Sequence, residues 1–511
     1  MNEDAPRAGR RWFALILLGI LLHAGALLNS DLGLDAHVRL QAINAPEGDA
    51  QVLPWGKLRV VDETAQTPNR SASYDGYIPP WSTSESAMKL TSLFALLAVA
   101  TLSACVPRWE SNRGSFVGLW PVLALVSPVF LFATGRGYDE PVIALMIGVG
   151  SAGFYFNKGD EPHELRMHVL LLATSLLLVM GWKGFSMHSA IGVWLLAVLL
   201  GAAWMELERR QREGQQATWL SHPWFMGGAV AVVVYFTTFF LGLFTETGTF
   251  SIVGQSPGNF LLASLLAVLD AFGIYLLIGF AFWPFIASSV EHFRSLRGPG
   301  ITLLVMFSSG LLTGIVCYIA ALWTLESALW GLPLLETALL LGNNGRYATC
   351  LFLPAVLLLG WERPSSAAQS VSKKSLALAV CLLLPAVLFT SLHGQQHWSD
   401  DAGEGLAEEL VEGDSSLLLV APDALAMHHL YVLRTHVDLD GSLGLNGYWR
   451  TSGEAAAFLE ASSTEADLVV VAPNAGFNPD EQQWLLVAEE RAPVTVTGWA
   501  EGSWRIYRNV G

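Results

Sequence analysis

Long apolar runs separated by short polar segments make up most of the chain between residues 12 and 392. A helix needs about 20 mostly apolar residues to cross the hydrocarbon core of a bilayer. Runs of this kind lie at 12–29, 89–106, 115–134, 141–157, 167–182, 188–205, 224–245, 260–288, 300–324, 347–361 and 375–392. The pattern predicts about eleven transmembrane helices. We therefore expect a mainly α fold, a polytopic membrane helical bundle.

The segment after residue 394 has a different pattern. Short apolar runs, SLLLVAP, DLVVVAP, APVTVTGW and SWRIYR, alternate with the helical patterns GEGLAEELVE and NPDEQQWLLVAEE. This alternation is typical of a small α/β domain. We predict a membrane domain at 1–394 and a soluble extracytoplasmic α/β domain at 395–511. Within the membrane domain, the first outer loop at 30–88 is expected to form juxtamembrane helices and turns.

The composition agrees with a membrane protein. Hydrophobic residues make up 52% of the 511 positions and charged residues only 14%, whereas soluble domains have roughly 25% charged residues. Most of the net charge of −16 comes from 395–511, which hold 19 Asp and Glu against 5 Lys and Arg. An acidic balance of this kind argues against nucleic acid as a partner.

The distribution of basic residues predicts the orientation of the chain. If the Arg-rich N-terminus is cytoplasmic, the loops at 107–114, 158–166, 206–213, 291–298 and 362–374, which carry Lys or Arg, all fall on the inner side. This satisfies the positive-inside rule. An odd number of spans then places the C-terminal domain outside the cell. We expect a multi-pass protein of the plasma membrane.

Two outer segments carry the candidate chemistry. LGLDAHVRL at 32–40, just after the first span, holds Asp35, His37 and Arg39. LFATGRGYDE at 131–140 places several polar residues between two membrane-length runs: Arg136, Tyr138, Asp139 and Glu140. Charges close to lipid are costly, so such residues either form an ordinary turn or line a polar cavity with a function.

A structural interpretation of both segments stays open. Asp35 can cap a helix, and Arg39 can extend to the lipid headgroups. Asp139 and Glu140 can begin the next helix, whose dipole favours carboxylates. Among weaker candidates, Lys183 either contacts a phosphate or is solvated. Asp270, within an apolar run, either serves a function or forms a hydrogen bond between helices.

The layout resembles the GT-C superfamily of membrane glycosyltransferases. It has an acidic residue directly after span one, a second acidic site after span three, many further spans and an outer C-terminal domain. These enzymes take sugars from polyprenyl-phosphate carriers, and they include the protein O-mannosyltransferases and the aminoarabinose transferase of lipid A. By position, Asp35 is similar to their first-loop acidic residue, and Asp139 or Glu140 to the second.

NNGRYATCLFLP at 343–354 adds to this likeness. Many transferases of the group have an Arg-Tyr pair at the outer mouth of a late span, where the arginine faces the carrier phosphate. The resemblance implies this role for Arg346, with Tyr347 beside it. The other interpretation is an aromatic and arginine pair that anchors a span at the membrane interface.

GRGYDE also resembles the second-loop motif of oligosaccharyltransferase catalytic subunits, and DAHVR is loosely similar to their first-loop motif. The tryptophan-rich WWDYG-type motif that holds the acceptor sequon in those enzymes is missing from the sequence. Transfer of a single sugar is therefore favoured over an oligosaccharyltransferase-like activity, which stays the alternative.

The GT-C resemblance implies transfer of a hexose or pentose from a polyprenyl (dolichyl) phosphate to a protein, lipid or glycan acceptor at the outer membrane face. The implied catalytic residues are Asp35, Asp139 and Glu140, with Asp35 as the base for the acceptor hydroxyl. The implied phosphate contacts are Arg346, Arg39 and Tyr347, and the implied substrate contacts are His37, Arg136 and Tyr138. If a divalent cation, Mg²⁺ or Mn²⁺, takes part, Asp35, Asp139 and Glu140 are its candidate ligands.

Two other classes of protein remain as alternatives. In a lipid or ion transporter (flippase), Asp35, Asp139 and Asp270 would bind ions or headgroups. Transporters often show two halves with broken helices at matching places, and the sequence shows no such pairing. In a non-catalytic membrane scaffold that presents the acidic tail, Asp35 would have no role in chemistry.

Overall fold

The computed structural model describes residues 5–44, 76–106, 118–214, 222–246, 248–288, 290–361, 371–422, 424–461, 466–473, 475–494 and 502–510. The chain forms two compact units. Unit 1 comprises Met1–Gly25, Ser92–Thr134 and Asp139–Leu392, and unit 2 comprises Ala26–Thr91, Gly135–Tyr138 and His393–Gly511. The domain boundary at 394 stays a prediction.

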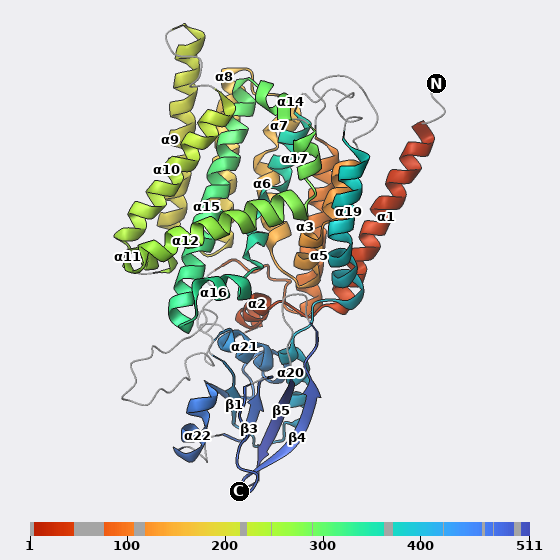
Figure 1. Cartoon of the computed structure of the whole chain (residues 1–511), viewed down its shortest axis with the longest axis vertical. Coiled ribbons are helices and arrows are strands. Elements are labelled where there is room, and N and C mark those ends of the chain that lie inside the picture. Colours follow the sequence, from red (N-terminus) through yellow and green to blue (C-terminus); the bar gives the residue numbers. More distant parts are fainter. Residues whose placement is uncertain are drawn as a thin grey trace. The chain divides into compact units, whose positions relative to one another are not determined.

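Unit 1 is a helical membrane bundle (Figure 1). Its elements are α1 (Ala5–Asn29) and α3 (Glu85–Ala104), which both extend into unit 2, then α4 (Leu119–Val126), α5 (Pro128–Gly135), α6 (Glu140–Gly150), α7 (Gly153–Phe156), α8 (Pro162–Trp182), α9 (Met187–Arg212), α10 (Pro223–Leu243), η3 (Thr249–Ser251), α11 (Ile252–Gln255), α12 (Pro257–Val268), η4 (Leu269–Gly279), α13 (Trp283–Ala287), α14 (Val290–Ser295), α15 (Pro299–Trp330), α16 (Leu334–Leu340), η5 (Asn344–Leu351), α17 (Phe352–Gly360), α19 (Lys373–Leu388) and η6 (Phe389–His393). Within it, α10 packs against α15, and α8 packs against α9 and α6.

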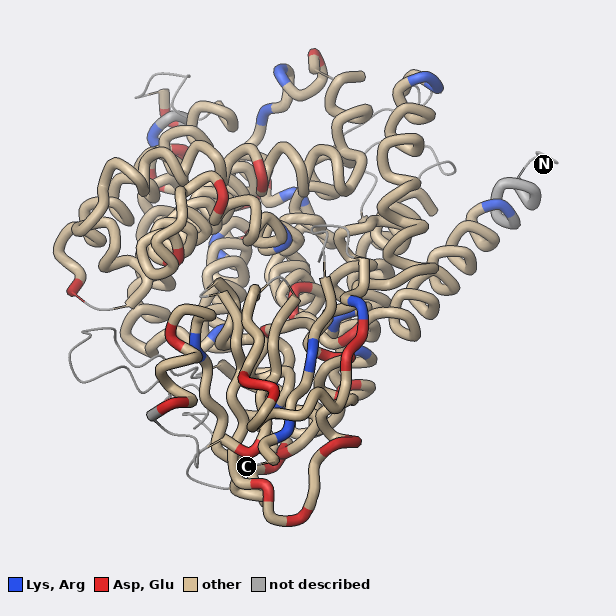
Figure 2. Tube along the Cα trace, turned by 60° about the horizontal axis from the view of Figure 1, so that its bottom comes forward, with Lys and Arg blue, Asp and Glu red and all other residues tan. Residues whose placement is uncertain are grey.

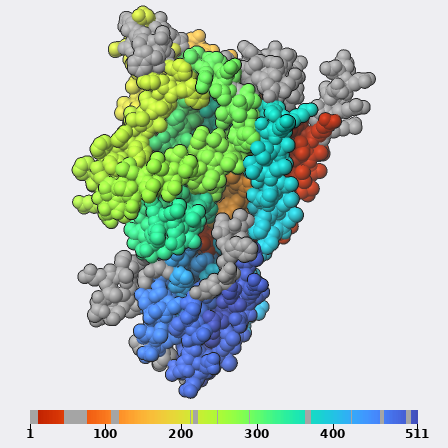
Figure 3. Space-filling view, in the orientation of Figure 1, coloured from red at the N-terminus to blue at the C-terminus, as the bar shows by residue number. Residues whose placement is uncertain are grey.

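The protein is a multi-pass membrane protein. Among the described residues, 8 segments are long and apolar enough to cross a membrane. The helices of unit 1 also expose large apolar side chains, as α10 does with Phe236, Phe240 and Leu241. Figure 3 shows the face of the molecule that carries this helix. Side chains of this kind are stable against lipid, so they favour a membrane setting.

The count of eleven long helices is not confirmed, because three predicted spans are interrupted. The run at 115–134 forms α4 and α5, the run at 141–157 forms α6 and α7, and the run at 347–361 begins as the 3-10 helix η5 before α17. The first break lies at Ser127, which has an extended backbone. The next residue, Pro128, disfavours a helical conformation at Ser127 and lacks an N–H.

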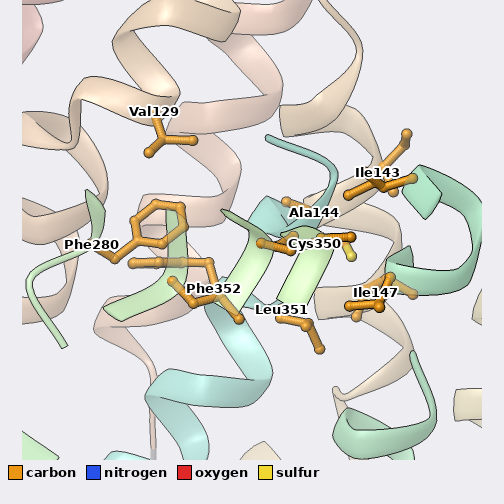
Figure 4. Close-up of a cluster of buried hydrophobic side chains, with 14 of the residues drawn as sticks. Val129, Ile143, Ala144, Ile147, Phe280, Cys350, Leu351 and Phe352 are labelled. Atoms are coloured by element: carbon orange, nitrogen blue, oxygen red, sulfur yellow. The ribbon is translucent and has the colours of Figure 1, made fainter. Parts of the chain in front are cut away.

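An aromatic cluster joins two of these interrupted runs, through α5 and α17, to the end of η4. The ring centroids of Phe130 and Phe280 lie 5.1 Å apart, those of Phe280 and Phe352 5.0 Å apart, and those of Phe130 and Phe352 5.6 Å apart. Figure 4 shows Phe280 and Phe352 against each other within the apolar core of unit 1. Aromatic pairs of this geometry stabilise the core beyond what the burial of the ring area contributes.

Unit 2 contains the predicted α/β fold. Its helices are α2 (Leu34–Asn44), α20 (Trp398–Glu409), α21 (Ala426–Val437) and α22 (Ser452–Ala461). Its strands are β1 (Ser416–Val420), β2 (Asn446–Arg450), β3 (Leu468–Val471), β4 (Trp484–Arg491) and β5 (Ser503–Asn509). The sheet order is β2-β1-β3-β5-β4, in which β2, β1 and β3 are parallel and β5 and β4 are antiparallel. Figure 2 shows the acidic segments of this part of the chain.

One local expectation changes in unit 2. The pattern NPDEQQWLLVAEE suggests a helix, but its second half is the strand β4, which pairs with β5. The cross-strand partner overrides a local helical preference that is weak. The segment 30–88, predicted to be the first outer loop, contains the helix α2, which packs against α21; residues 45–75 of this segment lie outside the described residues.

The central strand β1 is buried along its whole length. We expect Leu418→Ala, at a position with 0% exposure, to lower the free energy of unfolding by about 2–5 kcal/mol, because it removes core contacts and leaves a cavity. Leu485→Ala is the matched control, since Leu485 is 56% exposed on β4. Thermal unfolding of the full chain in detergent measures both changes. Equal unfolding temperatures for the two variants would contradict the assignment of β1 to the core.

Candidate functional site

Asp139 precedes α6 and occupies its N-cap position, but its side chain does not cap that helix. Instead, the indole Nε1–H of Trp182 donates a hydrogen bond to Asp139 Oδ2 at 3.0 Å. The Lys183 ammonium lies 2.8 Å from Asp139 Oδ1. Helix capping therefore does not account for the position of the Asp139 carboxylate.

Lys183 contacts more of the candidate residues than its position in the sequence suggests. It follows directly after the span α8, and its ammonium also lies 5.5 Å from the centre of the Tyr347 ring. Burial opposes a charged ammonium, but the negative charges of Asp139 and Glu140 outweigh burial and raise the pKa of Lys183 above its usual value. The available sequence signal was a basic residue immediately after the end of a span.

Glu140 and Arg346 form a buried ion pair. Arg346 Nε lies 2.8 Å from Glu140 Oε1, and the two side chains are 3% and 2% exposed. Arg346 also donates to the Asn343 carbonyl at 3.2 Å and to Asn344 Oδ1 at 3.3 Å. Its guanidinium lies 4.9 Å from the centre of the Tyr347 ring. The second carboxylate oxygen of Glu140 has no hydrogen-bond partner among the described residues.

The segment that carries Arg346 is supported by η4, a π-helix within a membrane span. A Cβ atom on Gly345 would collide with the Asp270 carboxylate and the Tyr275 ring. The Tyr275 hydroxyl donates to the Gly342 carbonyl at 3.1 Å. Asp270 therefore lies against the η5 segment, and glycine at 345 permits this close approach.

The other predicted site residues lie in unit 2. Asp35 is in the first turn of α2, and its side chain is 51% exposed. His37 and Arg39 are buried on the same helix. Arg136 and Tyr138 are also buried. The Gly33 N–H donates to the Arg136 carbonyl at 2.9 Å, so this loop lies beside the start of α2.

His37 belongs to a cluster around Asp400 of α20. His37 Nε2 lies 3.3 Å and His436 Nε2 3.0 Å from the same oxygen, Asp400 Oδ1. His37 Nδ1 is also 3.1 Å from Thr435 Oγ1. These contacts join α2, α20 and α21 within unit 2. They favour a structural role for His37 over the implied contact with substrate.

Asp31 is a titratable residue that the sequence analysis did not single out. The His397 N–H donates to Asp31 Oδ2 at 2.6 Å. Burial and the nearby charge of Asp400 raise the pKa of Asp31 to about 7. A carboxylate with this pKa suits proton transfer near neutral pH. The only sequence signal was its position directly after the first span.

The structure thus gathers the candidates into two sets. Asp139, Glu140, Arg346 and Tyr347 come together in unit 1, with Lys183 added. Asp35, His37, Arg39, Arg136 and Tyr138 belong to unit 2.

The predicted metal ligands have other partners. Asp139 is paired with Lys183, and Glu140 with Arg346. Among the described residues, no three His, Cys, Asp or Glu side chains form a group suited to a metal ion. The arrangement around Asp139 and Glu140 therefore does not fit a divalent cation as it stands, and participation of Mg²⁺ or Mn²⁺ stays a prediction.

Comparison of the sequence with protein-family models and with curated proteins found no match. Among solved structures, the chain is similar to ArnT from Cupriavidus metallidurans in the apo state, with 12% identity, a TM-score of 0.38 and coverage of 98% of each chain. It is also similar to ArnT from the same organism bound to undecaprenyl phosphate, with 13% identity, a TM-score of 0.41 and coverage of 98% of this chain and 97% of that chain. ArnT is an aminoarabinose transferase, one of the enzyme types that the sequence resembles. A likeness of this size assigns no role to any residue.

The raised pKa of Asp31 leads to a prediction about stability. Between about pH 4 and 7 the folded chain holds a proton on Asp31 that the unfolded chain has released, so the free energy of unfolding falls as the pH rises through this window. Asp31→Asn removes this loss. We expect the unfolding temperature of the variant to exceed that of the wild type by about 1–3 °C at pH 8 and to equal it near pH 4.

The matched control for this experiment is Glu408→Gln, at an exposed carboxylate of α20. It should leave the unfolding temperature unchanged at both pH values. A difference between wild type and Asp31→Asn that does not vary with pH would contradict the raised pKa.

The Glu140–Arg346 pair leads to a second prediction. Arg346→Met leaves a buried carboxylate without its cation, so we expect the free energy of unfolding to fall by about 3–5 kcal/mol. Glu140→Gln combined with Arg346→Met should recover most of this loss, because no charge then remains buried. Thermal unfolding in detergent tests the pair. A double variant less stable than the single variant would show that Glu140 does not depend on Arg346.

Proposed function

We propose that the protein is a membrane glycosyltransferase that moves a sugar from a polyprenyl-phosphate carrier to an acceptor hydroxyl at the outer membrane face. The observation that carries the proposal is the pair of cations in unit 1, Lys183 and Arg346, which both lie beside the Tyr347 ring. Each is held by its own carboxylate, Asp139 or Glu140.

The position of these cations supports a lipid-linked phosphate as the ligand. Lys183 follows immediately after the last residue of a span, Trp182. A tryptophan at a span end is typical of the membrane interface. The phosphate of a prenyl carrier lies at this level while its tail stays in the hydrocarbon layer. Lys183 and Arg346 are suited to hold the phosphate and to stabilise the negative charge that develops as it leaves.

The acceptor step requires a base. In this proposal Asp35, half exposed at the start of α2, takes the proton from the acceptor hydroxyl. The acceptor oxygen bonds to the anomeric carbon as the bond from that carbon to the phosphate oxygen breaks. The electron pair of this bond leaves with the polyprenyl phosphate, and the configuration at the anomeric carbon inverts. Asp31, with its pKa near 7, is a second candidate for this base.

The orientation of the chain belongs to the same proposal. A cytoplasmic N-terminus, supported by the basic inner loops, places the C-terminal domain and Asp35 outside the cell. A sugar that is already activated by its phosphate carrier can be transferred there without a nucleotide-sugar donor. The acceptor class, whether protein, lipid or glycan, is left to experiment.

A transporter is the alternative of a different class. The π-helix η4 interrupts a membrane span and places Asp270 against Gly345, and interrupted helices are also typical of transporters. In sealed vesicles, a transporter would move the carrier lipid between leaflets without forming a new glycosidic bond. A transferase would form that bond in detergent, where no leaflets exist.

We expect Asp35→Asn to lower the initial rate of sugar transfer by about 100-fold or more, because the amide cannot accept the proton. The assay uses radiolabelled undecaprenyl- and dolichyl-phosphate hexoses and pentoses, with solubilised total membranes as the acceptor mixture. Glu408→Gln, at an exposed carboxylate of the same unit, should keep the wild-type rate. Transfer by Asp35→Asn at the wild-type rate would remove Asp35 from the mechanism, and Asp31→Asn then tests the second candidate.

A further inference from the structure

The helix α21 presents one face to α2. Residues 428, 431 and 435 follow one another at spacings of three and four, which places them on the same side of a helix. Gln41 Nε2 donates to the Tyr431 carbonyl and, at 2.7 Å, to Thr435 Oγ1. His37 Nδ1 lies 3.1 Å from the same hydroxyl. These contacts fix α2 against α21 within unit 2.

His428 occupies the first turn of this face and lies opposite Asp35. Its Nε2 atom is 3.6 Å from Asp35 Oδ1, and the two side chains are 28% and 51% exposed. The residue before α21, Leu425, has a left-handed backbone with φ of 62°. A non-glycine residue rarely adopts this conformation, and here it lies at the bend from which α21 starts toward α2.

We infer that His428 is a positioning residue for Asp35, so that the C-terminal domain takes part in sugar transfer. The inference rests on the proposed function, in which Asp35 is the base. A partly exposed carboxylate in the first turn of a helix can adopt several rotamers. A base that is out of position lowers the rate of the reaction. The imidazole of His428, 3.6 Å from Asp35 Oδ1, restricts the rotamers of this carboxylate and keeps it in position for the acceptor hydroxyl.

The other titratable groups near the contact have partners of their own. His429 Nδ1 lies 2.8 Å from Ser399 Oγ on α20. His37 of α2 and His436 of α21 both contact Asp400 of α20. His428 is thus the histidine of this region that reaches Asp35 in the described contacts.

The test compares His428→Ala and His428→Gln with the wild type in the transfer assay described above. We expect His428→Ala to lower the maximal rate about tenfold, with no change in the donor concentration that gives half of that rate. We expect His428→Gln to keep most of the rate, because its amide N–H occupies the place of imidazole Nε2.

His163→Ala is the matched control, since His163 is an exposed histidine of unit 1; it should keep the wild-type maximal rate. A wild-type maximal rate in His428→Ala would overturn the role of His428 while the proposed function stands. If His428→Ala does not fold, His428→Leu replaces it, and a wild-type maximal rate in that variant overturns the role equally. A wild type that transfers no sugar from any of the carriers would overturn the proposed function and this inference together.

Discussion

The buried pairing of carboxylates with cations is the constraint on which the membrane unit depends. Glu140 and Arg346 are almost fully inaccessible to solvent, and a charge of that kind is tolerated only with an opposite charge and further hydrogen bonds beside it. Arg346 has both, through Glu140 and Asn344. Asp139 and Lys183 repeat the arrangement next to it. The two carboxylates and two cations make this cluster neutral as a whole.

The irregular helices of unit 1 make this cluster possible. Backbone that departs from a regular helix at membrane depth must be satisfied inside the protein. The break at Ser127, the π-helix η4 and the 3-10 helix η5 all adjoin the buried core of unit 1, which Phe130, Phe280 and Phe352 fill. Regular helices would give each span a uniform apolar surface. The interruptions instead bring the N-terminus of α6 and the Arg346 segment to each other.

In unit 2, the described part of the segment after the first span packs with the tail of the chain. The helix α2 is bonded to α21 through Gln41 and contacts α20 through His37. The Asp400 carboxylate contacts two histidines from different helices, His37 and His436. Replacement of any one of these three residues therefore disturbs the other two. A candidate base on α2 is thereby held by a domain that begins more than 350 positions later.

The sequence by itself determined the membrane bundle, the α/β tail and the polar residues between apolar runs, because hydrophobic periodicity and composition are local properties of the chain. It also pointed to Asp35, Asp139, Glu140 and Arg346, because these charges lie between or next to apolar runs in a layout that resembles the GT-C superfamily. Only the tertiary structure decided their partners. Glu140 and Arg346 lie 206 positions apart, and no local pattern relates them. The same holds for Asp35 and His428, for the raised pKa of Asp31, and for β4, which is a strand because β5 lies beside it.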